Sequence, residues 1–585
     1  MKRRLLALAL AGVMIFSALS GCGQTEESAV SVPAAEFGTS TEETETSAEE
    51  TTSTRFSQVG TFFMPYTTGF EWDPYNCTSM ENQAVMQLIY EGLFYIDNDW
   101  AFQPELCESY TVNDDYTSWV FTLREVEFSN GKALTASDVV YSIALAKEST
   151  LYKERFSNVE SVTATGTYEV TVTLNMSNNR LPCLFDFPIV PNGSGLAPAG
   201  TGPFVRDGTT LTKNPSWWGD SSAISFNTIA LCESKSAEDS RDNFEIDGIN
   251  FLYNSPLSPD AAAFHCDYEL WESKGTTMEY LGFNCAYSDV FSDARARLAI
   301  TYAINRDYIA EGVYQNFADA AVLPCPPSAS FYAEDLADKY DYDPAYALEL
   351  LLSSDYFSLA EDSPIRTAFS SSASSDGSSE EEAVENAAAE VIVEEIETEE
   401  EDDEEDEDGD LAEPDEDEEE EEEEETTSIV SSGPNPIKII VMNGSEDRTT
   451  AAKAIASDLS AVGFTVTVSV MDKDDYYASF TSGDYDLFLA EVRLPPDFDI
   501  WHLILNGGQL NYGLVPADQT AIDLYYDAME NEGNRYEFYQ YILEQGYICP
   551  ICFENNAVFT TRGVFANLDP TPDRLFSNIT DIIVN

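Results

Sequence analysis

The residues with the spacing of a reactive site are Cys549 and Cys552, in the segment YICPICF. A CxxC pair can form a redox disulfide or contribute to a metal site. Zinc and nickel sites are usually completed by a second pair or by histidines, but the chain has no second pair and only two histidines, His265 and His502. Since the pair lies in an apolar, strand-like run, two small buried thiols are the simpler interpretation. We therefore predict no metal and no cofactor.

The chain also lacks the common motifs of hydrolytic and nucleotide chemistry. It contains no Walker lysine loop, no GxSxG elbow and no HExxH helix. Carboxylates occur throughout, but no spacing selects a catalytic pair. The sequence predicts a protein that is not an enzyme.

A further cysteine, Cys22, has the setting of a lipid attachment site. Three basic residues at positions 2–4 precede an apolar stretch at 5–19, which is the pattern of a signal peptide. The stretch Leu19-Ser20-Gly21-Cys22 resembles the bacterial lipobox, where the chain is cut before a cysteine that carries lipid. We expect a signal peptide at 1–21 and acyl chains on Cys22 that hold the protein at the outer face of the cell membrane. The alternative is an ordinary signal peptide with an incidental cysteine.

The charge balance excludes several partners. The 585 residues include 107 Asp or Glu and only 28 Lys or Arg, for a net charge of −79. Residues 380–425 hold 31 of these carboxylates, and the rest of the chain still carries −48. We expect no binding to nucleic acid, and no contact with the membrane except through the lipid.

Two segments have the composition of unfolded chain. Residues 22–54 form a Ser, Thr and Glu-rich linker with few large apolar groups, which predicts a disordered tether. Residues 361–433 contain the acidic tract, with eight consecutive glutamates at 418–425. Charge repulsion predicts a disordered insertion there.

The remaining sequence alternates between strand and helix patterns. Residues 119–123 alternate as a half-buried strand, and Thr135 and Asp138 have the spacing of a helix capping box. Residues 437–442 and 464–470 are predicted strands on either side of a helix at 447–462. A strand, helix and strand of this size indicate a partly parallel α/β sheet.

Five blocks of sequence together resemble one family. The block LIYEGLFYIDNDWAFQPELCESYTVNDDYTSWVFTLREVEFSNGKALTASDVVYS, residues 88–142, is similar to extracellular solute-binding proteins of family 5, which serve peptide- and nickel-type ABC importers. Four more blocks follow in the family's order: GTGPF at 200–204, NPSWWGD at 214–220, FSDARARLAITYAINRDYIAEGVY at 291–314 and YDYDPAYALELL at 340–351.

The resemblance implies a two-lobed periplasmic-binding-protein clamp of the Venus-flytrap type, type II or cluster C-like, with α/β lobes. Lobe I is expected from residues 55–89, 201–280 and 546–585, with a subdomain at 90–200 inserted in it. Lobe II is expected from 281–545, and the acidic insertion at 361–433 extends from it. The chain is expected to cross between the lobes near 280 and 546, and to act as a monomer.

The resemblance also implies a ligand site between the lobes. In oligopeptide-binding relatives, an aspartate in a W-x-x-D-Y loop holds the peptide's amino terminus. Here Val492 stands where the tryptophan would be, and prolines fall near the aspartate position. The candidate ligand-binding residues are Cys77, Thr78, Ser79, Glu491, Arg493, Asp497, Asp499, Trp501 and Tyr512.

Other roles remain open for some of these candidates. Asp497 or Asp499 could instead cap the helix that follows. Trp501 and Tyr512 could instead be buried in the core.

The function implied by the resemblance is the capture of oligopeptides or dipeptides, which the protein passes to ABC permease and ATPase subunits. Two alternatives remain. The same clamp could hold a nickel chelate or a sugar, or it could act as a surface sensor without transport.

The lipid anchor gives the first testable prediction. Cys22→Ala should abolish processing and lipidation at this site, because the thioether needs the cysteine sulfur. Metabolic labelling with a radioactive fatty acid measures the attached lipid. Label that persists in the variant would place the anchor at another residue.

Overall fold

The computed structural model describes residues 60–70, 72–258, 264–372, 392–395, 434–505 and 508–585. All of these described residues belong to one compact unit. The predicted signal peptide and the linker at 22–54 therefore lie outside the described residues. Within the described ranges, no helix combines the length and apolar character needed to cross a membrane.

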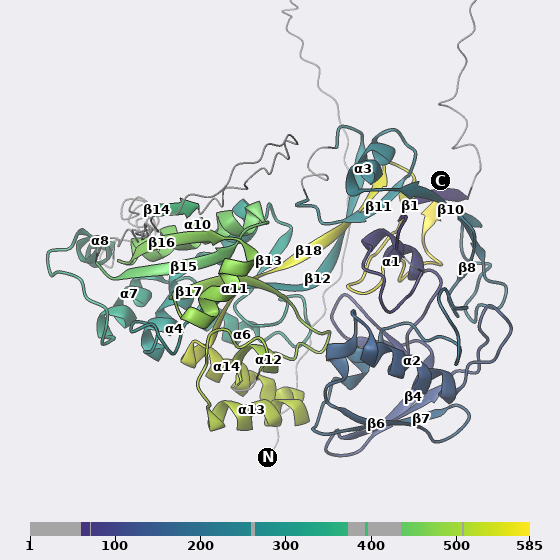
Figure 1. Cartoon of the computed structure of the whole chain (residues 1–585), viewed down its shortest axis with the longest axis horizontal. Helices are drawn as coiled ribbons and strands as arrows, with labels where there is room; N and C mark the ends of the chain where they lie inside the picture. The colour runs from purple at the N-terminus through teal and green to yellow at the C-terminus, as the bar shows by residue number, and fades with distance from the viewer. Residues whose placement is uncertain (1–59, 71, 259–263, 373–391, 396–433, 506–507) are drawn as a thin grey trace, which may run out of the picture. The chain divides into compact units, whose positions relative to one another are not determined.

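Lobe I is built on a four-stranded sheet. Its strands, in spatial order, are β1 (Thr61–Thr67), β10 (Thr228–Ser234), β9 (Thr210–Lys213) and β8 (Phe204–Asp207). Helices α1 (Met80–Met86) and α3 (Ala237–Glu245) belong to the same lobe (Figure 1). Helix α1 begins after Ser79, whose hydroxyl accepts a hydrogen bond from the Asn82 N–H at 3.3 Å. Phenylalanine rings such as Phe62, Phe204 and Phe226 fill the core.

The inserted subdomain forms an antiparallel sheet with one long helix. The strands are β4 (Cys107–Val112), β5 (Ser118–Leu123), β7 (Glu169–Leu174) and β6 (Val159–Ala164), in that order, and the helix is α2 (Ala136–Glu148). A hairpin of β2 (Phe94–Ile96) and β3 (Phe102–Pro104) precedes them. Trp119, Phe121 and Leu123 are buried as predicted. The predicted capping box is confirmed, because the Thr135 N–H donates to the Asp138 carboxylate at 2.7 Å.

Lobe II is built on the larger sheet of the described chain, part of which continues into lobe I. Its strands, in spatial order, are β11 (Phe251–Asn254), β18 (Ile548–Thr561), β12 (Tyr268–Phe283), β17 (Leu487–Arg493), β15 (Pro436–Met442), β16 (Thr465–Met471) and β14 (Ile392–Glu395), with β13 (Ala318–Ala320) paired to β18. Strands β15 and β16 are parallel and are joined by α10 (Glu446–Ala461). This confirms the predicted strand, helix and strand.

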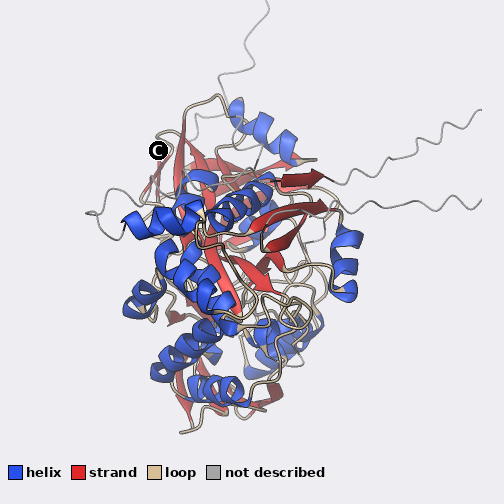
Figure 2. Ribbon diagram, turned by 90° about the vertical axis from the view of Figure 1, so that its left-hand side faces the viewer, coloured by secondary structure: helices blue, strands red, loops and turns tan. Residues whose placement is uncertain are grey.

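Lobe II also contains many helices, and Figure 2 shows helices in front of strands on this side of the molecule. They are α4 (Ala294–Ala303), α5 (Arg306–Tyr308), α6 (Glu334–Ala337), α7 (Pro344–Ser353), α8 (Pro364–Ser372), α11 (Lys473–Ser482), α12 (Trp501–Ile504), α13 (Gln519–Glu530) and α14 (Arg535–Gln545). Helix α10 ends before Gly463, whose φ of +108° lies in the region that favours glycine.

Two described pieces fall inside the predicted disordered insertion. Helix α8 occupies 364–372, and its Phe369 is 7% exposed in the lobe II core. Strand β14 pairs in parallel with β16. Disorder was predicted from 361 onward, but the fold continues through α8, because apolar side chains such as Phe369 give that helix a face to bury. The acidic residues at 396–433 lie outside the described residues.

Strands β12 and β18 pair along most of their length and connect the two lobes (Figure 1). The lobe II core includes Met278 and Phe553, whereas Val558 packs in the lobe I core. The two cores therefore meet near residues 273–277 of β12 and 554–556 of β18, some residues from the predicted crossings at 280 and 546. The pairing shifts register there, between Ser273 and Thr277.

Where the chain crosses between the lobes, the backbones of β12 and β18 lie very close together at Gly275. A Cβ placed on Gly275 would lie 2.1 Å from the carbonyl oxygen of Glu554, which is far inside van der Waals contact. Only glycine fits this position without moving one strand.

Gly275→Ala should therefore destabilise the crossing. Displacement of β18 should lower the free energy of unfolding by about 1–3 kcal/mol, measured by urea denaturation. Gly195→Ala is the matched control, because nothing lies within 4 Å of a Cβ at Gly195. Its effect should stay within about 0.5 kcal/mol. Equal effects of the two substitutions would contradict the steric argument.

Candidate ligand-binding site

Two adjoining cavities lie between lobe II on one side and lobe I with its inserted subdomain on the other. The smaller cavity has a volume of about 170 Å³ and the larger about 650 Å³. Arg155, Arg493 and Leu494 line both, so the two cavities adjoin, and together they make up the cleft. The cleft is a candidate site because distant segments converge on it: α1 and the C-terminal segment of lobe I, the subdomain, and the end of β17 in lobe II.

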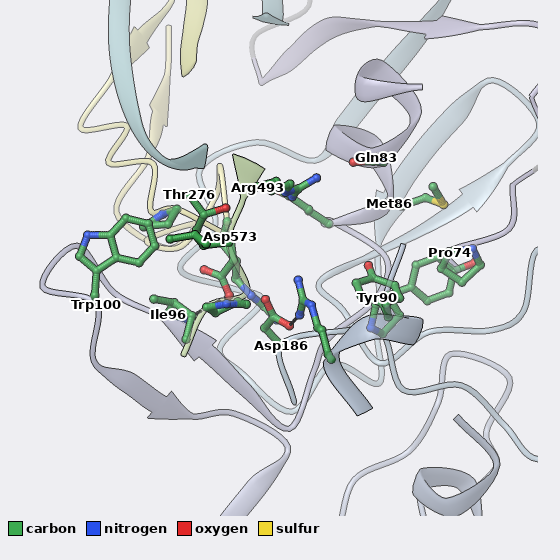
Figure 3. A pocket seen from close by; sticks show the side chains of 18 of the residues that line it. Pro74, Gln83, Met86, Tyr90, Ile96, Trp100, Asp186, Thr276, Arg493 and Asp573 are labelled. Atoms are coloured by element: carbon green, nitrogen blue, oxygen red, sulfur yellow. Dashed lines mark hydrogen bonds and ion pairs between the residues drawn. The ribbon is translucent and has the colours of Figure 1, made fainter. Parts of the chain in front are cut away.

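The smaller cavity is rich in charge. Figure 3 shows Arg493, Asp573 and Asp186 around it, with Trp100 on one side and Tyr90 on the other. Asp186 forms an ion pair with Arg155. Asp573 accepts a hydrogen bond from the Ile96 N–H at 2.9 Å.

A raised pKa and ion pairs with arginines partly neutralise the acidic groups in and beside this cavity. Burial raises the pKa of Asp573 to about 7, against the opposing charge of Arg574 and with a contribution from Asp186. Arg574 is paired with the buried carboxylate of Glu105. Two carboxylates and two arginines of this region are thus matched within the protein.

Arg493 differs from the other arginines of the cleft. It is the last residue of β17, opposite Thr277 of β12, so its side chain leaves the sheet where the strand ends. Among the described residues, its guanidinium has neither an ion-pair nor a hydrogen-bond partner, and the residue is exposed. A cation in this state is suited to a carboxylate on a ligand.

The larger cavity combines aromatic and apolar walls with two aspartates. The Trp501 ring lies 5.1 Å from the Tyr525 ring and 6.1 Å from the Tyr526 ring, between centroids. Asp497 and Asp499 face the same cavity. The apolar lining includes Leu151, Met176, Leu184, Val492, Leu494, Pro495, Leu503, Leu510 and Met529.

The two aspartates have different partners. Asp497 is 4% exposed and accepts a hydrogen bond from the Asn178 amide of the subdomain at 2.9 Å. Asp499 accepts hydrogen bonds from the Trp501 N–H at 2.8 Å and the Tyr525 hydroxyl at 3.1 Å. Burial, followed by the charge of Asp497, raises the pKa of Asp499 to about 6. Asp499 thus accepts from the first N–H of α12, although the N-cap position itself is Ile500, and it also lines the cleft.

Five of the nine predicted ligand residues do not line either cavity. The side chain of Glu491 is bound by Arg448. Tyr512 stacks on Phe480 within lobe II, with ring centroids 4.5 Å apart. The other three are Cys77, Thr78 and Ser79.

The segment 77–79 instead positions α1. Ser79 caps the helix, and the Cys77 carbonyl accepts a hydrogen bond from the Gln83 amide at 2.8 Å. Gln83 and Met86 of α1 reach the smaller cavity. The predicted segment therefore lies one turn before the residues that line the cleft.

Several cleft residues were missed by sequence reasoning. They are Gln83, Trp100, Arg155, Asp186, Asp573 and Arg574. The dipeptide Asp573-Arg574 follows Pro572 near the chain's end, and charged residues beside prolines were the available signal. The sequence did not place this segment opposite Arg493.

Contacts between the subdomain and lobe II flank the larger cavity. The Asn179 amide donates to the Ala528 carbonyl at 2.9 Å, and Arg180 pairs with Glu532 at 3.2 Å. The Trp100 indole N–H donates to the Ser328 hydroxyl at 2.9 Å. The structure therefore has the two lobes in contact beside the cleft.

A two-lobed α/β fold, joined by paired strands and enclosing a charged cleft, defines a solute-binding clamp. The family model for bacterial extracellular solute-binding proteins, family 5, matches residues 101–391. The chain belongs to this family. Family and fold are thus confirmed as the sequence predicted them.

Similar proteins include the glutathione-binding protein GsiB of Salmonella typhi, 26% identical over 310 residues. That match covers 48% of this chain and 59% of GsiB. The oligopeptide-binding protein AppA of Bacillus subtilis, solved with a nonapeptide, has a TM-score of 0.54 and 18% identity, over 90% of this chain and 99% of AppA. The ABC transporter substrate-binding protein CtaP of Listeria monocytogenes has a TM-score of 0.62 and 16% identity, with coverages of 90% and 99%. These structural likenesses describe the fold.

The raised pKa of Asp499 predicts a pH dependence of stability. With a folded pKa of about 6 against 3.8 ordinarily, the folded state favours the protonated carboxyl. Its stabilising contribution is complete below about pH 4 and is lost as the pH rises through about 6. Asp499→Asn should therefore raise the free energy of unfolding at neutral pH by about 1–3 kcal/mol relative to the parent.

Urea denaturation at a series of pH values measures this difference. The gain of Asp499→Asn should shrink as the pH falls through about 6 and disappear below about 4, where the parent's carboxyl becomes protonated in both states. Asp355→Asn is the control, since the Asp355 side chain is 81% exposed. A gain that is independent of pH would contradict the burial argument.

Proposed function

We propose that the protein captures short peptides between its lobes outside the cell and delivers them to the permease and ATPase subunits of an ABC importer. In this proposal the lipid on Cys22 holds the protein, as a monomer, at the membrane surface. The observation that carries it is a cleft between two lobes in which Arg493, without a partner among the described residues, lines both a charged and an amphipathic cavity.

The charge pattern of the cleft supports a zwitterionic ligand. Arg493 can bind a terminal or side-chain carboxylate through two parallel hydrogen bonds. Asp497 and Asp499 lie in the larger cavity that Arg493 also lines, and they offer acceptors for an ammonium group. A peptide carries both groups at a separation that its backbone sets.

The size and lining of the larger cavity support a short peptide with an apolar or aromatic side chain. Ligand pockets commonly have volumes of about 300–1,000 Å³, and this cavity measures about 650 Å³. Its aromatic group, Trp501, Tyr525 and Tyr526, offers flat surfaces to a side chain. AppA was solved with a nonapeptide and GsiB is described as glutathione-binding, so peptide ligands have precedent among similar proteins.

Delivery requires the cleft to open and close. The pairing of β12 with β18 at 273–277 is the natural place for this motion, because the chain crosses between the lobes there and the register shifts between Ser273 and Thr277. A ligand that contacts both lobes favours the closed state by its difference in affinity for the two states.

A metal chelate is the second candidate ligand. His502 lines the larger cavity, and its Nδ1 is buried without a hydrogen-bond partner among the described residues. An imidazole in this state could complete the coordination of a metal that arrives with its own chelator.

The fourth prediction tests peptide capture. In titration calorimetry with a pooled peptide library, Arg493→Ala should weaken binding by about 1.5–3 kcal/mol, or roughly ten- to a hundredfold, because a charged hydrogen bond is lost. Arg562→Ala is the matched control, since Arg562 is 66% exposed and has an ion-pair distance of 3.7 Å to an exposed aspartate. It should bind as the parent does.

Parallel titrations with glutathione and with nickel–histidine chelate separate the candidates. Binding of the chelate alone, reduced by His502→Ala, would replace the peptide assignment. Peptide binding that Arg493→Ala leaves unchanged would move the carboxylate site to another part of the cleft.

A further inference from the structure

Three carboxylates meet in lobe II outside the lining of the ligand cleft. Glu279 of β12, Glu491 of β17 and Glu554 of β18 each place an oxygen within 4.8 Å of the others. The strands are neighbours, with Glu491 opposite Glu279 and Glu554 opposite Thr277 in the register. Sheet pairing therefore fixes the three side chains against one another.

One arginine partly neutralises this cluster. Arg448 donates to the Glu279 Oε1 at 2.8 Å and to Glu491. Glu279 is 1% exposed, and its Oε2 has no hydrogen-bond partner among the described residues. A single guanidinium thus faces three carboxylates, and a buried oxygen remains unsatisfied, which is costly at such a depth.

A buried hydroxyl beside the cluster is also unsatisfied. Tyr314 is 1% exposed, and its hydroxyl has no hydrogen-bond partner in the described part of the chain. Burial first, and then the negative charges of Glu279 and Glu554, raise the pKa of this hydroxyl. Two buried polar atoms on different elements, the Glu279 Oε2 and the Tyr314 hydroxyl, thus lack a hydrogen-bond partner among the described residues.

We propose that Glu279, Glu491 and Glu554 bind a hard divalent cation, best represented by Ca²⁺. All three ligands are carboxylate oxygens, which Ca²⁺ and Mg²⁺ prefer. Oxygens bound to Ca²⁺ at about 2.3–2.6 Å lie at most about 5 Å apart, and the observed limit of 4.8 Å fits this sphere. The cation also balances the charge, because two positive charges and Arg448 match three carboxylates.

Water molecules can complete the coordination. The side chain of Glu491 is 50% exposed, so solvent reaches one side of the site. The irregular set of three carboxylates suits Ca²⁺ better than Mg²⁺, which requires nearly ideal octahedral geometry.

A shared proton is the competing arrangement. Glu279 and Glu554 are close enough to hydrogen-bond when one of them is protonated. Burial, followed by the charge of Glu279, raises the pKa of Glu554 to about 8. One proton would satisfy the buried Oε2 of Glu279 but would leave the cluster with a net negative charge.

The site lies beside the crossing between the lobes. Glu554 is the residue whose carbonyl approaches Gly275, and Glu279 follows the register shift of β12 by two residues. A bound cation would hold β12, β17 and β18 together on the lobe II side of the crossing.

Thermal unfolding of the full chain tests the site, with EDTA, CaCl₂ or MgCl₂ added. Ca²⁺ should raise the Tm of the parent, because a ligand that binds only the folded state stabilises it. Titration of the Tm gives the affinity, which Glu491→Gln and Glu554→Gln should lower by about 10- to 100-fold or more. Glu349→Gln is the matched control, as Glu349 is an exposed carboxylate of the same lobe.

Three results would overturn the proposal. Absence of any Ca²⁺ effect on the parent, with Glu554→Gln at least as stable as the parent, would establish the shared proton instead. An equal response of all variants to Ca²⁺ would place the cation at carboxylates elsewhere in this acidic chain. A preference for Mg²⁺ over Ca²⁺ would contradict the choice of cation.

Discussion

The pairing of β12 with β18 is the contact on which the rest of the structure depends. These strands carry the chain between the two cores, and their hydrogen bonds continue on both sides of the register shift. The shift requires a backbone approach that only Gly275 permits. Because β17 and β13 pair with this ribbon on one side of the crossing and β11 on the other, the relative placement of both walls of the cleft follows from it.

Several arginines line the cleft, although the chain as a whole is strongly acidic. The protein carries a net charge of −79, yet Arg155, Arg493 and Arg574 gather around one small cavity. Arg155 is paired with Asp186, and Arg574 is paired with Glu105. Burial raises the pKa of Asp573 to about 7. The cleft thus gathers positive side chains within a strongly acidic protein.

The buried acidic groups also show how the fold meets the cost of desolvation. Glu105 has a paired arginine, and Glu91 accepts hydrogen bonds from the indole N–H groups of Trp217 and Trp218 at 2.9 and 2.8 Å. The group at Glu279 contains more carboxylates than its single arginine can balance. This contrast within one molecule is the reason that the third group, and neither of the first two, points to a bound cation.

The sequence by itself determined the family, the two-lobed fold and the local elements. Alternation at 119–123, the capping box at Thr135 and the glycine stop at Gly463 depend on neighbouring residues alone, so they could be predicted. The tertiary structure decided the site. Glu491 and Arg493 lie two residues apart on β17, yet Arg448 binds the first, while the second reaches the cleft because the strand ends there. Asp573 and Asp186 meet Arg493 only because β12 and β18 fold distant segments together, and no local pattern records that contact.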